Sequence, residues 1–388
     1  MYPDLSYFFH DLFGTQTDNW LAIFKTFGVF LAFAFLASAF VLYKELRRKE
    51  KEGIFNPQKF ISIYTKDAII KESLFNGLLI GFACFKLPFI WDNWELFKSN
   101  PASIVFNLKG NVFTGLLGGI ALAAFNYYKG MQSPLLNERK EIKVYPSSKI
   151  SDITVVTAIS GVLGARLFSI LENLDAFLKD PIGQLLSGSG LTVYGGLIVG
   201  FIAGYWYVRK LGMDGKHAMD ACAPAIVMGQ LVGRMGCQFS GDGDWGIVNT
   251  APKPSWFALP DWVWVYDYPR NVLQRGEKMA DCVGDYCNHL VPGVFPTPIY
   301  EVTGYAITFS ILWFLRKRIK TSGVLFFIFM ILSGIVRFFV EDLRVNETYE
   351  LLGMFWSFSK YIAVGIIVVG LAGVTWLLQK AKPVVETS

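Results

Sequence analysis

Long apolar stretches recur along the chain and are separated by polar or charged segments. Because a helix needs about 20 apolar residues to cross the hydrocarbon core of a bilayer, the pattern predicts an all-α, polytopic bundle of about nine transmembrane helices. The two stretches 74–91 and 218–233 are short or rich in small residues, and a re-entrant or half-buried helix is the alternative for each. The predicted spans are residues 20–43, 74–91, 111–128, 154–173, 191–208, 218–233, 299–315, 323–340 and 359–378.

The composition supports a membrane protein. Hydrophobic residues make up 53% of the 388 residues and charged residues only 17%, whereas soluble proteins carry about 25% charged residues. The formal net charge is +5. These values exclude a disordered chain, a nucleic-acid-binding protein and an ordinary soluble enzyme. We find no internal repeat, so residues 1–388 are interpreted as one integral membrane domain that contacts the lipid bilayer.

The basic residues predict how the chain is oriented. Cytoplasmic segments of membrane proteins carry an excess of Lys and Arg. With the N-terminus outside and the C-terminus inside, most Lys and Arg residues fall in the predicted cytoplasmic segments. The most basic runs are KELRRKEKE at 44–52 and RKRIK at 316–320. Residues 44–73 are therefore predicted to be a basic cytoplasmic loop.

The first residues do not resemble a cleavable signal peptide. The start, MYPDLSYFFHDLF, is acidic rather than basic, and the apolar run that follows is too long for a signal sequence. Its aromatic residues favour an interfacial helix that lies on the membrane surface.

One long segment, residues 234–298, is predicted to be an extracytoplasmic loop region. It contains Cys282 and Cys287. Extracytoplasmic compartments are oxidising, so the two cysteines either form a disulfide or remain free thiols. A metal site here is disfavoured because only His289 is near and zinc needs three or four ligands.

Several charged residues lie in or beside the predicted spans. Arg166, Arg234 and Arg337 are the arginines of this kind, and Glu341 and Arg344 follow Arg337 at helical spacing. An arginine in hydrocarbon costs about 2.5–3.5 kcal/mol on insertion scales. One interpretation is an ion-pair network that fixes helix packing. The other is a binding site for an anionic head group, since the guanidinium fork matches phosphate.

Three further segments lie near the same predicted level. Tyr194, Gly195 and Gly196 begin a stretch rich in small residues, which is either a helix-packing face or a place where a ligand approaches the backbone. The turn GDGDWG at 241–246 carries two carboxylates, which is weak evidence for a cation site. The segment PTPIYE at 296–301 places Tyr300 and Glu301 at the interface.

Together these segments resemble the prolipoprotein diacylglyceryl transferase family of bacterial membrane enzymes. The resemblance extends over about 151–378, in the following order of motifs: LGARLF (163–168), YGGLIVG (194–200), GRMGCQFSGDGDWG (233–246), PTPIYE (296–301) and RFFVEDLR (337–344). The family usually has seven spans, so residues 74–128 are interpreted as an extra helix pair. The chain has Tyr194 where the family commonly has His, Cys237 where it has Asn, and Ser333 where it has Tyr.

The resemblance implies an activity. Members transfer the diacylglyceryl group of phosphatidylglycerol to the lipobox Cys thiol of a prolipoprotein signal peptide, forming a thioether and releasing glycerol phosphate. No cofactor or metal is implied. The location implied is the bacterial plasma (inner) membrane, with the active site towards the extracytoplasmic side. A secondary transporter and an inactive lipid-binding paralogue are the alternatives.

The resemblance also implies residue roles. Arg337, Tyr194 and Glu341 are assigned to catalysis, with Arg337 stabilising the phosphate and Tyr194 favoured as a hydrogen-bond donor to it, because a tyrosine pKa near 10 makes a poor base. The phosphatidylglycerol-binding residues implied are Arg234, Gly195, Gly196, Gly236, Gly246, Arg166, Glu301 and Tyr300.

Overall fold

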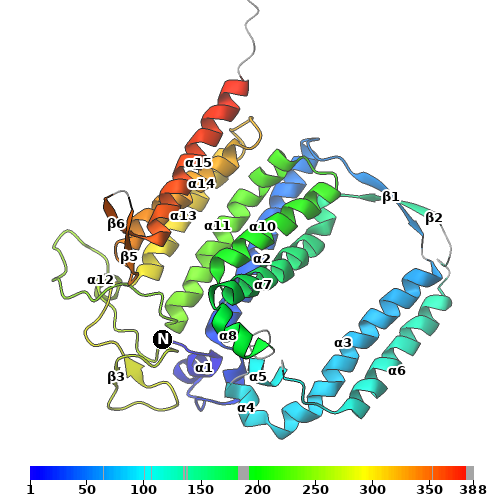
Figure 1. Cartoon of the computed structure of the whole chain (residues 1–388), viewed down its shortest axis with the longest axis horizontal. Coiled ribbons are helices and arrows are strands. Elements are labelled where there is room, and N and C mark those ends of the chain that lie inside the picture. Colours follow the sequence, from blue (N-terminus) through cyan, green and yellow to red (C-terminus); the bar gives the residue numbers. More distant parts are fainter. Residues whose placement is uncertain are drawn as a thin grey trace, which may run out of the picture. The chain divides into compact units, whose positions relative to one another are not determined.

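The computed structural model describes residues 1–63, 65–99, 101–105, 107–133, 136, 139–181, 192–351 and 353–381. Within these residues the protein is mostly helical (Figure 1). Five of the described helical segments are long and apolar enough to cross a membrane: Thr26–Lys51, Lys66–Asp92, Pro146–Glu172, Val324–Glu341 and Phe358–Ala381. The prediction of a helical membrane protein is therefore confirmed, while the number of spans remains a prediction.

The other four predicted spans are also helices. They are α6 (Val112–Met131), α10 (Val193–Lys210), α11 (Gly215–Ser240) and α13 (Thr297–Leu315). Glycines and polar residues interrupt the apolar runs of these four helices. Helix α11 extends past the predicted end at residue 233, so Arg234 lies inside the helix and not after it.

The chain divides into two compact units. The first comprises Met1–Phe55, Ile150–Thr154 and Tyr205–Ser388, and the second comprises Asn56–Lys149 and Val155–Gly204. The first unit contains the arginine motifs of the second half of the sequence. Arg166 and the Tyr194–Gly196 segment belong to the second unit.

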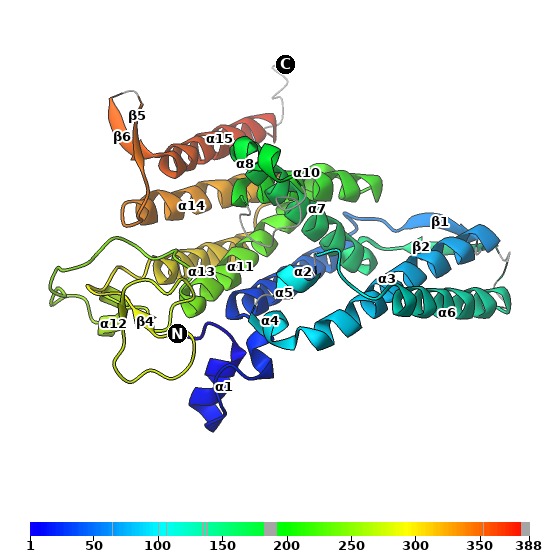
Figure 2. The ribbon, with the colours of Figure 1, turned by 60° about the horizontal axis from the view of Figure 1, so that its bottom comes forward.

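Helix α11 lies at the centre of the first unit. It packs against α2 (Thr26–Lys51), α13 and α14 (Val324–Glu341), and α14 in turn packs against α15 (Phe358–Ala381), as Figures 1 and 2 show. Around α11 lie two apolar clusters, one against α2 that includes Leu46 and Ala221, and one against α13 and α14 that includes Val227 and Leu312.

Polar groups fix the ends of these helices. Asp214 caps α11 by accepting from the backbone N–H groups of Lys216 and His217, and Gly241 ends it in a left-handed conformation. Inside α11, Asp220 accepts from the backbone N–H groups of Gly323 and Phe326, at 2.7 and 3.0 Å, at the start of α14. These contacts set the depth of α11 and therefore the position of the residues on its last turns.

Smaller elements complete the first unit. At its N-terminal end lie α1 (Leu5–Phe13) and the 3₁₀ turn η1 (Trp20–Ile23). Residues 241–296, called the long loop below, carry α12 (Asp261–Trp264) and the pair β3 (Glu277–Lys278) and β4 (Asn288–His289). The hairpin β5 (Thr348–Leu351) and β6 (Met354–Ser357) joins α14 to α15.

The second unit contains two helix pairs. Helices α3 (Lys66–Asp92) and α6 lie side by side (Figures 1 and 2), and α4 (Trp94–Ser99) and α5 (Pro101–Val105) connect them. At their other ends, β1 (Gln58–Ile63) pairs antiparallel with β2 (Arg139–Val144). The second pair is formed by most of α7 (Ile150–Glu172), which is followed by α8 (Leu174–Lys179), and by most of α10.

Two predicted segment boundaries differ from the observed elements. The helix predicted at 20–43 begins at Thr26 and continues to Lys51, because Arg and Lys at a helix C-terminus are compatible with its dipole. Residues 44–73 therefore contain the end of α2, the strand β1 and the start of α3 rather than a continuous loop.

Candidate active site

Three helix ends meet at one place in the first unit. The C-terminal ends of α11 and α14 and the N-terminal end of α13 are joined there by the backbone on both sides of Gly246. The Gly246 N–H donates to Phe295 O and the Ile247 N–H to Leu343 O, each at 2.8 Å. These bonds hold the residues after α11 and α14 next to the first turn of α13, although they are far apart in the sequence.

Glu301, in the first turns of α13, is the centre of this site. Its Oε1 accepts from Arg337 Nη1 at 2.9 Å, and its Oε2 lies 2.8 Å from Arg234 Nε. Arg344 Nη1 is 3.6 Å from the same Oε2. The Glu301 side chain is 0% exposed. One buried carboxylate therefore brings together arginines from α11, from α14 and from the turn after α14.

Asp244 is a second shared carboxylate. One of its oxygens contacts Arg234 and the other contacts Arg344. In addition, the Thr297 hydroxyl donates to the Asp244 backbone carbonyl at 2.7 Å, which fixes the main chain at this point. Unlike Glu301, the Asp244 side chain is 30% exposed, so an incoming anion could compete with it for the two guanidinium groups.

Glu341 forms a second ion pair with Arg337. Its Oε2 lies 3.0 Å from Arg337 Nη2, one helical turn earlier on α14. Its Oε1 accepts from the Ser357 hydroxyl at 2.7 Å and also from the Asn346 amide. Asn346 precedes the β5–β6 hairpin, and Ser357 is its last residue. The position of Arg337 thus depends on the base of this hairpin.

The formal charges of the cluster balance. Arg234, Arg337 and Arg344 face Asp244, Glu301 and Glu341. Such a network agrees with the first interpretation of these arginines, an ion-pair network that fixes helix packing. Arg234 and Arg337 nevertheless keep 23% and 22% of their side chains exposed. Their guanidinium groups can therefore still bind an anion at the open side of the cluster.

The pKa values of Asp242 and Asp244 are shifted in opposite directions. Burial raises the pKa of Asp242, and the neighbouring Asp244 carboxylate raises it further. Burial also opposes the ionisation of Asp244, but the guanidinium groups of Arg234 and Arg344 outweigh this and hold its pKa below the ordinary value. Asp244 is therefore the charged member of the pair.

The same carboxylates are close to a thiol. One ligand atom each from Cys237, Asp242 and Asp244 lies within 4.8 Å of the others, which is compatible in distance with a metal ion. Asp244, however, already gives both oxygens to arginines. Three such groups are also fewer than most metal sites provide, so this arrangement gives little support to a metal centre.

Several predicted binding residues have clear positions. Tyr300 donates to Val263 O at 2.7 Å and so contacts α12 in the long loop. Gly236 faces α2, where an added Cβ would lie 2.8 Å from Phe30 Cβ. At Gly246 an added Cβ would lie 2.4 Å from Leu343 O. Gly246 is thus required by the close approach of two backbones, and Gly236 permits tight helix packing. A direct lipid contact of either remains a prediction.

The remaining predicted residues lie in the second unit. Arg166 is on α7, and Tyr194, Gly195 and Gly196 are in the first turn of α10. The two glycines face α7: an added Cβ would lie 2.5 Å from Gly164 O at Gly195 and 3.1 Å from Gly161 O at Gly196. These contacts agree with the interpretation of the small residues as a helix-packing face. The lipid-binding role of all four residues remains a prediction.

The sequence did not single out every member of the cluster. From the sequence, Arg344 stands out only by its helical spacing from Arg337, and Asp244 only as one of two carboxylates in a turn. Ser357 gave no signal because a lone serine between two apolar segments is common. The charge pattern could have pointed to Asp244, since a buried arginine requires a carboxylate partner.

The chain is similar to bacterial proteins of one kind. A family model described as prolipoprotein diacylglyceryl transferase matches residues 119–376. The phosphatidylglycerol–prolipoprotein diacylglyceryl transferase of Lysinibacillus sphaericus is 26% identical over 255 residues, which are 65% of this chain and 85% of the relative. The proteins of the same name from Clostridium tetani and Finegoldia magna are 27% and 29% identical, covering 61% of this chain and 84% and 81% of the relatives.

Proposed function

The chain belongs to the prolipoprotein diacylglyceryl transferase family, whose model matches more than half of its residues, and we propose that it transfers the diacylglyceryl group of phosphatidylglycerol to the thiol of a lipobox cysteine. It is a membrane transferase. The observation that carries the proposal is the convergence of Arg234 and Arg337 on Glu301. The relatives named above act, by their names, on phosphatidylglycerol and a prolipoprotein.

The proposed location is the bacterial plasma membrane, with the arginine cluster towards the extracytoplasmic side. The ends of α11 and α14 and the start of α13 would face that side. The most basic segments, around residues 44–52 and 316–320, lie at the opposite ends of α2 and α13. This arrangement agrees with the positive-inside rule and with an N-out, C-in chain of nine spans.

The proposed reaction breaks one bond and forms another. The thiolate sulfur of the lipobox cysteine attacks the glyceryl carbon that carries the phosphate, a C–S bond forms, and the C–O bond to the phosphate breaks. Glycerol phosphate leaves with the bonding electrons, and the thiol proton is taken up by a base or by water. The protein must therefore align the carbon with the sulfur and stabilise the negative charge on the leaving phosphate.

Arg234 and Arg337 are suited to stabilising the negative charge on the leaving phosphate. We propose that the lipid phosphate takes the place of Asp244 at the exposed side of Arg234 and Arg344, while Glu301 stays in place. The difference in exposure supports this, because Asp244 is partly open to solvent and Glu301 is fully buried. Arg337, held by Glu301 and Glu341, would then stabilise the phosphate during displacement.

The thiol also has to lose its proton. A free cysteine has a pKa of about 8.5, so only a few per cent is ionised at neutral pH. Cationic groups near the thiol would lower its pKa. We propose that the arginines serve this purpose too, and that Tyr194 donates a hydrogen bond to the phosphate. The helix pair 74–128 is proposed as an addition to the family core; the family match begins at residue 119, within the second helix of this pair, and so leaves most of the pair outside it.

A direct assay tests the function. Purified protein is incubated with phosphatidylglycerol labelled in its acyl chains and with a lipobox peptide, and the peptide is examined for a thioether-linked diacylglyceryl group. We expect product formation and release of glycerol phosphate. Bound lipid without product would support the inactive lipid-binding paralogue. Solute uptake into vesicles without lipid consumption would support a transporter. Either result would contradict the proposal.

A further inference from the structure

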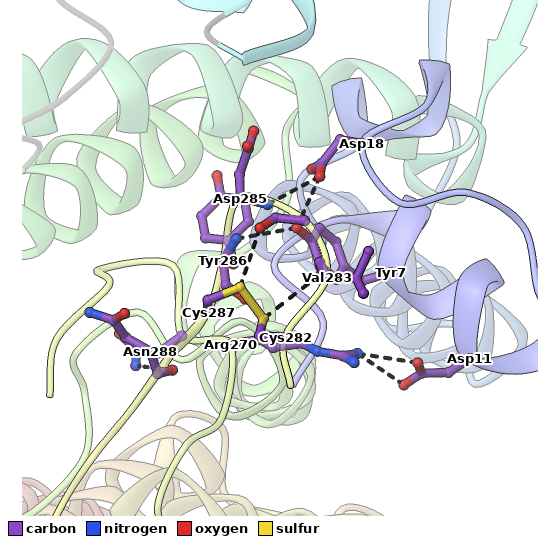
Figure 3. Close-up of a disulfide and its surroundings, with 12 residues drawn as sticks. Tyr7, Asp11, Asp18, Arg270, Cys282, Val283, Asp285, Tyr286, Cys287 and Asn288 are labelled. Carbon is purple, nitrogen blue, oxygen red and sulfur yellow. Dashed lines mark hydrogen bonds and ion pairs between the residues drawn. A yellow bond between two sulfur atoms is a disulfide. The ribbon is translucent and has the colours of Figure 1, made fainter. Parts of the chain in front are cut away.

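The segment between Cys282 and Cys287 is closed by a disulfide, as one of the two sequence alternatives predicted. The enclosed residues face the N-terminal segment of the chain, which is remote in sequence. The Tyr286 backbone N–H donates to the Tyr7 hydroxyl at 3.2 Å, and the Asp285 backbone N–H donates to Asp18 Oδ2 at 3.1 Å. Figure 3 shows this loop beside the residues of α1.

Tyr7 and Asp18 complete the arrangement on the other side. The Tyr7 hydroxyl donates to the same Asp18 Oδ2 at 3.2 Å, and the Ser6 hydroxyl accepts from the Asp18 N–H at 3.0 Å. Tyr7 is fully buried, and its ring meets the Tyr286 ring edge-on with 5.8 Å between centroids. The hydroxyl thus accepts from one segment and donates to another, which joins α1, residue 18 and the disulfide loop.

Charged contacts surround this bond network. Arg270, in the long loop, donates to both carboxylate oxygens of Asp11, at 3.1 and 3.4 Å, and its own backbone N–H donates to Asn288 O beside the disulfide. The Lys25 ammonium lies 5.6 Å from the centre of the Tyr286 ring. The opposite side of α1 exposes Phe8, Leu12 and Phe13. Only one face of α1 therefore contacts the long loop, and the other is apolar and accessible.

Gly284, between the two cysteines, shows how closely the loop fits. Its φ is +101°, and an added Cβ would lie 2.2 Å from Tyr7 Oη and 2.9 Å from Asp18 Oδ2. A glycine is needed both for this backbone conformation and for the space. Because the disulfide restricts the conformations that the four enclosed residues can adopt, it favours the one that accepts Tyr7 and Asp18.

We propose that the Cys282–Cys287 disulfide is a reducible clamp that holds the N-terminal helix on the long loop. With the bridge closed, the enclosed loop binds Tyr7 and Asp18 and α1 is docked. A small dithiol releases it: the dithiol gives two electrons and two protons, becomes a disulfide itself, and leaves Cys282 and Cys287 as thiols. The open loop then loses its fixed backbone donors, and α1 detaches. This inference goes beyond the transfer reaction and does not depend on it.

Hydrogen exchange of the full-length protein in detergent tests the clamp without an activity assay. After treatment with dithiothreitol, the amides of Leu5–Phe13 should exchange about tenfold faster or more, since the two hydrogen bonds from the enclosed loop, of about 1 kcal/mol each, are lost. The amides of α15 should not change. Unchanged protection of α1, with both thiols shown by alkylation to be reduced, would overturn the proposal.

A variant with an intact bridge gives a second test. Gly284→Ala should release α1 without any reductant, because its methyl group occupies the place of the Tyr7 hydroxyl. Gly53→Ala is the matched control, since Gly53 also has a positive φ, +72°, but has nothing within 4 Å of an added Cβ. The control should leave α1 protected. Protection of α1 in Gly284→Ala, or equal release in both variants, would contradict the clamp.

Discussion

Arg337 on α14 donates to Glu301 on α13, with 2.9 Å between Nη1 and Oε1. The bond crosses from one helix to another and ends on a carboxylate that is fully buried. Because the other oxygen of Glu301 faces Arg234, the carboxylate fixes the distance between two cations on different helices. We interpret Glu301 as the residue that keeps both arginines in position for one phosphate group.

Replacing Glu301 should therefore affect both arginines at once. Glu301→Gln leaves two guanidinium groups without their shared charge, and breaking a buried ion pair costs about 3–5 kcal/mol. We expect lower thermal stability in detergent and a loss of transfer of at least about tenfold. Glu347→Gln is the control, since Glu347 lies on the exposed approach to β5. Equal activity of the two variants would contradict the role of Glu301.

Gly246 gives a prediction that concerns packing. In Gly246→Ala the new methyl group would lie 2.4 Å from Leu343 O, and such overpacking costs about 1–3 kcal/mol. Gly233→Ala, in the interior of α11, meets nothing within 4 Å and should be neutral or stabilising by up to about 1 kcal/mol. Thermal unfolding of the two purified variants checks this. A stable Gly246→Ala protein would show that the two backbones can separate without cost.

Ser357 is predicted to act through Glu341. Ser357→Ala removes the 2.7 Å hydrogen bond to Glu341 Oε1, which is worth about 1 kcal/mol. We expect about a fivefold lower kcat with little change in KM for phosphatidylglycerol, and recovery in Ser357→Thr. Thr375→Ala serves as the control because that hydroxyl bonds only within α15. Failure of threonine to restore the rate would indicate that Ser357 matters only for folding.

The pKa of Asp244 predicts a dependence on pH. Burial alone would raise this pKa, but the guanidinium groups of Arg234 and Arg344 outweigh burial and hold it below its ordinary value. A carboxylate with a lowered pKa contributes stability above the unfolded value of about 4, and this contribution is lost as the pH falls through the folded value. Thermal unfolding between pH 7 and about pH 3 should show a steeper acid loss in the wild type than in Asp244→Asn. Parallel curves would contradict this.

The sequence alone predicted the helices and the positions of two arginines well, because apolar runs and misplaced charges are local signals. Arg234, Arg337 and Glu301 were expected near each other and do meet. The shared use of Asp244 was not predictable, because it depends on how the long loop returns to α13. Likewise, the contacts of Tyr7 with Tyr286 and of Asp18 with Asp285 arise from tertiary folding. Tyr7 is therefore buried, although an interfacial aromatic was expected.

The most direct test compares Arg234→Lys and Arg337→Lys in the transfer assay. Lysine keeps the charge but lacks the guanidinium fork, so it cannot hold a carboxylate and a phosphate in the same geometry. We predict that Arg337→Lys lowers the maximal rate about 100-fold, and that Arg234→Lys mainly raises the phosphatidylglycerol concentration needed for half of the maximal rate. Wild-type transfer kinetics in either variant would contradict the proposal that these two arginines hold the lipid phosphate.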